Sequence, residues 1–153
     1  MPTYERFEDL PIWRAAAELY DRTDDFITQA APRVRNPLLE QLERSALAIT
    51  TSIAASCRRT TVQEQRTRVT RARESADELC SMLLLIAHRP YLGDFRPEIS
   101  NLIRLTESCS RQLRAWAESP QTFMLKSGRY RPGPRQVSRT PRQASESAPP
   151  PSP

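Results

Sequence analysis

With 153 residues, the chain is long enough for one domain with a hydrophobic core and too short for two. Only 38% of its residues are apolar, no apolar run approaches the roughly 20 residues that a membrane helix needs, and the first residues do not resemble a secretory signal. We therefore expect a cytoplasmic protein without membrane contact. The net charge of +5 lies entirely in residues 126–153, which hold six basic residues and one acid, whereas residues 1–125 hold 17 arginines and 17 acids.

The first two predicted helices are marked by apolar residues that recur every three or four positions. The first runs from about Pro11 to Gln29, and proline is tolerated in its first turn. The second begins with Asn36 as N-cap and Pro37 at the first helical position. Because it is rich in small residues, we expect it to be the most buried of the helices. The two apolar stripes are Ile12, Ala16, Leu19, Thr23 and Phe26, and Leu38, Leu42, Ala46, Ile49, Ile53 and Cys57.

Two further helices follow the same period. The third starts at Thr61, which forms a capping box with Glu64. The fourth follows the segment 91–97 and ends at Ser119-Pro120. Their stripes are Val62, Gln65, Val69, Ala72, Ala76, Leu79, Leu83 and Ile86, and Ile99, Leu102, Thr106, Cys109, Leu113 and Trp116.

No segment alternates with the period of a strand, and the connections are short, which favours antiparallel neighbours. The sequence therefore predicts an all-α fold, an antiparallel up-down-up-down four-helix bundle over residues 1–120. Residues 120–153 hold eight of the 14 prolines, together with arginine and serine, and few apolar residues. Such a segment cannot bury enough surface to offset its ordering entropy, so we expect residues 121–153 to form a disordered basic tail.

Three motifs resemble a bacterial four-helix-bundle family. Residues 10–16, LPIWRAA, resemble the family's "L-x-V/I-W-x-x-A" start. The second helix is similar to "Q-L/I-R-R-A-A-V-S-I-P-S-N-I-A-E-G", and the third to "A-x-x-S-x-x-E-L-x-x-x-L". The matching residues are Gln41, Leu42, Arg44, Ala46, Ile49, Ile53 and Ala54, then Ala72, Ser75, Glu78, Leu79 and Leu83, and finally Tyr91-Leu92. Thr50, Ser52 and the pair Ala55-Ser56 depart from the pattern, at its proline, asparagine and Glu-Gly positions.

The family includes proteins encoded in intervening sequences of 23S rRNA genes and the accessory variability determinant (Avd) of diversity-generating retroelements. The resemblance covers about Phe7 to Trp116 and none of the tail. It implies a four-helix bundle that assembles as a ring-like homopentamer with a basic face. In the retroelement branch, it implies a ring that binds nucleic acid and a reverse transcriptase.

Catalytic and metal sites need titratable groups that converge, and the sequence offers few. The single histidine, His88, lies at the end of the third helix, where a cap of the last carbonyls is its expected role. Cys57, Cys80 and Cys109 are widely spaced and form no CxxC pair, which favours buried free thiols over a disulfide framework or a zinc site. Glu74 and Glu78 share a helix face but lack the histidines of a di-iron bundle. We expect no enzyme activity, no cofactor and no metal.

Arginine dominates the basic residues, and its planar guanidinium group suits phosphate because it donates two parallel hydrogen bonds. In the expected up-down-up-down bundle, the turn between the second and third helices lies at the same end as the end of the fourth helix, which carries Arg111 and Arg114. The alternative for the helical arginines is that they are solvated charges paired with acids such as Glu107 and Glu118. The alternative for the tail is that it is a solubilising linker without a binding partner. The predicted nucleic-acid-binding residues are Arg58, Arg59, Arg66, Arg68, Arg71, Arg73, Lys126, Arg129, Arg131, Arg135, Arg139 and Arg142.

These observations predict a non-catalytic, oligomeric accessory protein that binds RNA or DNA and assists a reverse transcriptase of a diversity-generating retroelement. The alternative is a protein-interaction scaffold without nucleic-acid contact. A small hydrolase or metal enzyme is a third reading, which would require a bound metal.

Overall fold

Four long helices make up most of the structure. A computed structural model describes residues 4–59 and 61–118. The described residues contain no strand, and the predicted all-α class with four helices is confirmed. The helices are α1 (Pro11–Ala30), α2 (Asn36–Cys57), α3 (Val62–Ala87) and α4 (Arg96–Glu118), with two short 3-10 helices, η1 (Phe7–Asp9) and η2 (Pro90–Phe95). The predicted tail, residues 121–153, lies outside the described residues.

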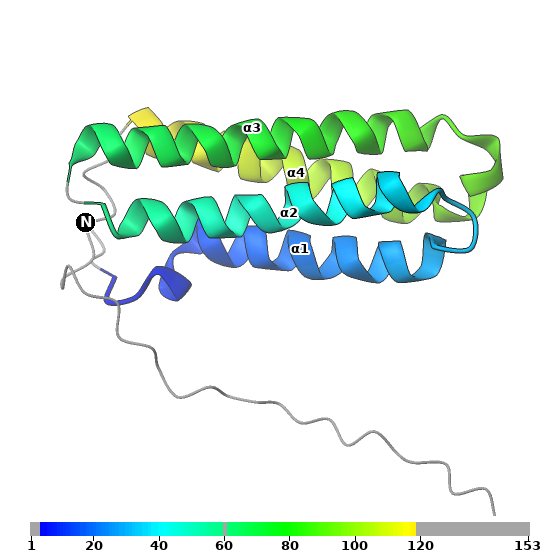
Figure 1. Cartoon of the computed structure of the whole chain (residues 1–153), viewed down its shortest axis with the longest axis horizontal. Coiled ribbons are helices and arrows are strands. Elements are labelled where there is room, and N and C mark those ends of the chain that lie inside the picture. Colours follow the sequence, from blue (N-terminus) through cyan, green and yellow to red (C-terminus); the bar gives the residue numbers. More distant parts are fainter. Residues whose placement is uncertain (1–3, 60, 119–153) are drawn as a thin grey trace, which may run out of the picture.

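The four helices lie side by side along the long axis of the molecule (Figure 1). Each helix packs against the next one in sequence, and α4 also contacts α1, which closes the bundle. The connection between α2 and α3 lies at one end, which we call the α2–α3 end (Figure 1). The α1–α2 and α3–α4 connections lie together at the opposite end. The first and third connections, which are distant in sequence, therefore become neighbours.

The ends of the helices follow local capping rules, with one correction. The Glu64 backbone N–H donates a 3.2 Å hydrogen bond to Thr61 Oγ1, and the Thr61 hydroxyl donates to the Glu64 carboxylate at 3.0 Å. His88 Nδ1 donates a 2.7 Å hydrogen bond to the Leu84 carbonyl, which confirms its capping role. The prediction that Asn36 is the N-cap of α2 is wrong. Arg35 has the extended N-cap conformation, and α2 already begins at Asn36.

The apolar stripes predicted for α1 and α4 are buried throughout. Each stripe contains one threonine, Thr23 and Thr106. Both side chains are fully buried, and each hydroxyl donates a 2.7 Å hydrogen bond to the carbonyl four residues earlier, of Leu19 and Leu102. A buried hydroxyl is tolerated when it has such a partner. This explains why a polar residue continues the stripe without interrupting the core.

Helix α2 buries the most residues, as its small side chains predict. The other three helices bury six residues each. Two of the buried hydroxyls in α2 are satisfied within the helix, because Thr50 donates to Leu47 and Ser56 donates to Ile53. The buried residues of α2 are Leu39, Leu42, Ser45, Ala46, Ile49, Thr50, Ile53 and Ser56.

The residues of the predicted stripes that are not buried lie at the ends of helices. Val62 is 43% exposed and Gln65 is half-buried, while Leu38 and Cys57 at the two ends of α2 are also half-buried. At the ends of a bundle the terminal turns have fewer neighbours, so the repeat continues past the core that it would face. The core also takes in residues from the connections that the helical period does not mark, namely Leu10, Val34 and Leu92.

Candidate nucleic-acid interface

Six of the predicted arginines lie in the half of the bundle that contains the α2–α3 end. They stand in the connection after α2 and along the first turns of α3, and we call them the α2–α3 arginines. This end also receives the last turn of α4, whose described part ends at Glu118 (Figure 1). The α2–α3 arginines are Arg58, Arg59, Arg66, Arg68, Arg71 and Arg73.

The α2–α3 arginines point to two sides of α3. Arg68 and Arg71 are one helical turn apart and line a depression of about 190 Å³ together with Arg59, Glu64 and Thr67. Arg66 and Arg73 are seven residues apart, two turns along the helix, and share a different face. The sequence prediction treated the six residues as one patch, whereas the helix places Arg66 and Arg73 on one flank of α3 and Arg68 and Arg71 on the opposite flank.

One interhelical hydrogen bond shows which levels of α3 and α4 lie beside each other. Ser110 Oγ donates to Asp77 Oδ1 at 3.2 Å. Because the two helices run in opposite directions, Arg73 and Arg114, each one turn from this pair, lie at the same level of the bundle. Arg111 and Arg114 line a pocket of about 350 Å³ that also contains Asp77 and Ser110. The arginines of α4 therefore extend the face that carries Arg66 and Arg73.

The alternative reading, in which these charges are paired on the surface, finds little support in the described contacts. Within residues 4–59 and 61–118, the ion pairs join Arg6, Arg14, Arg22 and Arg33 to acids elsewhere in the chain. Five of the α2–α3 arginines, all except Arg58, form none. Glu107 and Glu118, the acids expected to pair with the arginines of this end, form no ion pair in that part of the chain either.

The six basic residues predicted in the tail lie outside the described residues, so their role stays a prediction. They follow α4 in the chain, and the described part of α4 ends at the α2–α3 end (Figure 1). These residues are Lys126, Arg129, Arg131, Arg135, Arg139 and Arg142.

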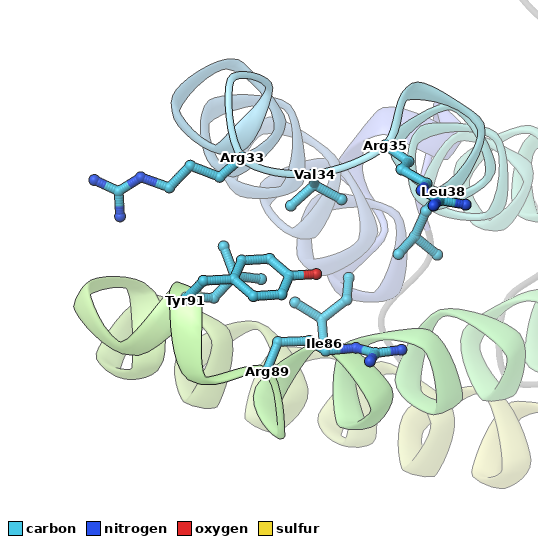
Figure 2. Close-up of a pocket in the computed structure, with 8 residues that line it drawn as sticks. Arg33, Val34, Arg35, Leu38, Ile86, Arg89 and Tyr91 are labelled. Atoms are coloured by element: carbon cyan, nitrogen blue, oxygen red, sulfur yellow. The ribbon is translucent and has the colours of Figure 1, made fainter.

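A second group of arginines, which the sequence reasoning missed, lies at the opposite end of the bundle. The α1–α2 connection and the residues after α3 enclose a pocket of about 520 Å³. We call it the arginine–tyrosine pocket. Figure 2 shows Val34 of the first connection facing Tyr91 of η2, with Leu38 and Ile86 beside them, while Arg33 extends away from the others. The pocket is lined by Arg33, Val34, Arg35, Leu38, Ile86, Arg89, Tyr91 and Leu92.

The pocket was missed because its residues come from two loops that no motif connects. Arg35 and Arg89 are 54 positions apart, and neither belongs to a helical stripe. The signal was indirect, since an antiparallel bundle with short loops brings its first and third connections to the same end. Each of these connections holds a basic residue next to an apolar one.

The cysteines behave as structural thiols. Burial raises the pKa of the Cys57 thiol to about 11, and burial together with the Glu18 carboxylate raises the pKa of Cys109 to about 11. Burial, then the Glu107 and Asp77 carboxylates, raises the pKa of Cys80. Since the thiolate is the reactive form, these environments disfavour nucleophilic chemistry. All three are free thiols, as predicted, but only Cys109 is buried, whereas Cys57 and Cys80 are half-buried.

Within residues 4–59 and 61–118, no three side chains among His, Cys, Asp and Glu gather as a metal site would require. Among the helices in that part of the chain, none combines the length and apolarity needed to cross a membrane.

Comparison with known proteins places the chain in a family. No curated protein and no solved structure matches it. The family described as 23S rRNA-intervening sequence protein matches residues 8–115, which is most of the chain and nearly the range over which the sequence motifs resemble that family. This protein therefore belongs to the family of 23S rRNA-intervening sequence proteins.

Proposed function

We propose that this protein is a non-catalytic, oligomeric nucleic-acid-binding protein that contacts phosphates through the α2–α3 arginines and the basic tail. One observation carries the proposal: residues 58–73 hold six arginines and a single acid, Glu64. Five of these arginines form no ion pair within the described residues, so their guanidinium groups remain available to an anionic partner.

The chemistry of arginine supports phosphate as the partner. Each guanidinium group stays charged at all physiological pH values and donates paired hydrogen bonds to phosphate oxygens. Contacts of this kind release condensed counterions and carry little sequence information, so RNA and DNA of many sequences are expected to bind.

Assembly would strengthen a surface that is modest on one chain. If several copies present the α2–α3 arginines to one strand, their contacts become multivalent and the overall affinity exceeds that of one copy. The family resemblance suggests a ring of five chains. From the same family resemblance, we propose a reverse transcriptase of a diversity-generating retroelement as a protein partner.

A second candidate function is a protein-interaction scaffold that does not touch nucleic acid. It is favoured by two neighbouring leucines on α3, Leu84 and Leu85, whose exposed fractions are 46% and 63%. Exposed apolar side chains that adjoin one another are typical of protein contacts. In that case the arginines would dock on acidic groups of a partner protein.

A filter-binding titration of the full chain with RNA and with duplex DNA tests the proposal. Binding should weaken steeply as salt rises, because each released counterion contributes to the salt dependence. Replacing the six basic tail residues by glutamine should weaken binding further. Absent binding, or binding that does not change with salt, would contradict the proposal. A pull-down that survives nuclease treatment would favour the scaffold.

A further inference from the structure

The arginine–tyrosine pocket is electropositive, and its positive charge is only partly compensated. Three arginines and no acid line it. Arg33 is engaged elsewhere, because it donates a 3.0 Å hydrogen bond to Asp94 and lies over the Phe95 ring. The guanidinium groups of Arg35 and Arg89 have no hydrogen bond or ion pair within residues 4–59 and 61–118. Two cations therefore face the pocket without an acidic partner.

The start of α2 adds to this positive character. Arg35 is the N-cap residue of a helix of 22 residues, its side chain makes no capping hydrogen bond, and the first turn holds no acid. Pro37 has no N–H, and the N–H groups of Leu38 and Leu39 donate to the Arg35 carbonyl, so the helix start contributes through its dipole and not through free donors. The helix start and the two arginines thus act on the same space.

The rest of the pocket is apolar and suits a flat ring. Val34, Leu38, Ile86 and Leu92 supply aliphatic surface, and the Tyr91 side chain, which is 55% exposed, lies across the gap between the two connections (Figure 2). An exposed aromatic ring beside an aliphatic surface is a typical platform for a nucleobase. The volume of about 520 Å³ lies within the range of pockets that hold small molecules.

We propose that the arginine–tyrosine pocket binds a nucleoside monophosphate, with the phosphate held by Arg35 and Arg89 and the base against Tyr91. The two uncompensated cations match the charge of a phosphate monoester, which is close to −2 at neutral pH. The chain's own tail is a poor occupant, because residues 126–153 hold six basic residues and one acid. Like charges would repel the tail from this pocket.

The phosphate monoester has two possible sources, a free nucleotide or the phosphorylated end of a nucleic-acid strand. Isothermal titration calorimetry of the full chain with adenosine monophosphate, adenosine and inorganic phosphate tests the shared chemistry. The nucleotide should bind at least about tenfold more tightly than either part alone, because both the charge-assisted hydrogen bonds and the ring contact are then made.

In a second arm, a short oligonucleotide with a 5′-phosphate is compared with the same oligonucleotide with a 5′-hydroxyl. Preference for the phosphorylated strand identifies a strand end as the ligand, and equal binding of the two strands restricts the site to the free nucleotide.

Variants of the pocket test the assignment residue by residue. Arg35→Gln and Arg89→Gln should each weaken nucleotide binding about tenfold, through the loss of a charge-assisted hydrogen bond. Tyr91→Leu should weaken binding of the nucleotide but leave that of inorganic phosphate unchanged. Arg33→Gln is the matched control, since it removes the same charge from the same connection but from a side chain that extends away. Its effect should stay within about twofold, because only long-range electrostatics change.

Two results would overturn the proposal. One is a nucleotide affinity no greater than that of adenosine or phosphate, and the other is an equal loss in Arg33→Gln and Arg35→Gln. Circular dichroism of each variant confirms that the helices are intact. Because the pocket and the α2–α3 arginines lie at opposite ends of the bundle, the pocket variants should leave the salt dependence of long RNA binding unchanged. The nucleotide site and the proposed function can therefore fail separately.

Discussion

The guanidinium carbon of Arg33 lies 5.3 Å from the centre of the Phe95 ring. Phe95 in turn meets Phe26 of α1 edge to face, with ring centres 5.7 Å apart and an angle of 84° between the ring planes. A continuous line of contacts thus runs from the core of α1 through η2 to the α1–α2 connection. It passes beside the arginine–tyrosine pocket, and its inner contact, between Phe26 and Phe95, fixes η2 against α1.

The inner member of this line should matter most for stability. Phe26 is fully buried, so Phe26→Ala removes apolar burial and leaves a cavity beside Phe95. We expect the free energy of unfolding to fall by about 3–5 kcal/mol, measured by urea titration with circular dichroism. Leu85→Ala, at a residue that is 63% exposed, serves as the control and should change it by less than about 0.5 kcal/mol. Similar losses in the two variants would show that the core is not where the structure puts it.

Arg33, the outer member of this line of contacts, should contribute little to the free energy of unfolding. Arg33 and Asp94 side chains are 46% and 82% exposed, so solvent screens their ion pair. Arg33→Gln should lower the free energy of unfolding by no more than about 1 kcal/mol, including the loss of the contact with Phe95. The same urea titration measures it. A much larger loss would mean that this contact organises the whole end of the bundle.

The capping box of α3 gives a third prediction. Thr61→Ala removes the acceptor of the Glu64 N–H at the start of a helix of 26 residues. We expect a loss of about 1 kcal/mol, because the backbone donor loses its partner. Thr51→Ala removes a hydroxyl that only bonds back to carbonyls within α2, and it should cost less than about 0.5 kcal/mol because alanine favours the helix. Equal losses would argue against the cap.

The buried thiol of Cys109 links stability to pH. Its pKa is raised from 9.0 to about 11, first by burial and then by the Glu18 carboxylate. Below about pH 9 the thiol is protonated in both states, whereas between about pH 9 and 11 only the unfolded chain loses the proton. The unfolded state then binds fewer protons, so the free energy of unfolding falls as pH rises through this window.

Replacing this thiol tests the linkage. In Cys109→Ala, the free energy of unfolding should fall less steeply between pH 9 and 11 than in the unaltered chain. Urea titrations at several pH values across the window measure both slopes. Parallel pH profiles would show that the thiol ionises as readily in the folded chain as in the unfolded one.

The sequence predicts the helices well because the core follows one simple periodicity. Every residue of the α1 and α4 stripes is buried, including Thr23 and Thr106. Their hydroxyls bond within the helix, so the polar group does not disturb the pattern. The errors at Val62 and Asn36 occur at helix ends, where periodicity gives no information on how far a neighbouring helix extends.

The candidate sites were only partly predictable. The cluster at residues 58–73 is visible in the sequence because its arginines are close together. Its division into two faces depends on the packing of α3 between α2 and α4. The arginine–tyrosine pocket could not be found from local patterns, because Arg35 and Arg89 become neighbours only when the helices assemble.

The most direct test of nucleic-acid binding by the α2–α3 arginines compares salt dependences. Arg66→Gln combined with Arg73→Gln should reduce the slope of log K against log salt for duplex DNA by about 1 for each arginine that contacts a phosphate. The matched control combines Arg22→Gln and Arg104→Gln, which remove the same charge from exposed side chains that bond to Glu18 and Asn101, and its slope should equal that of the unaltered chain. Identical slopes for all three proteins, or an equal reduction in the control, would contradict phosphate binding by this surface.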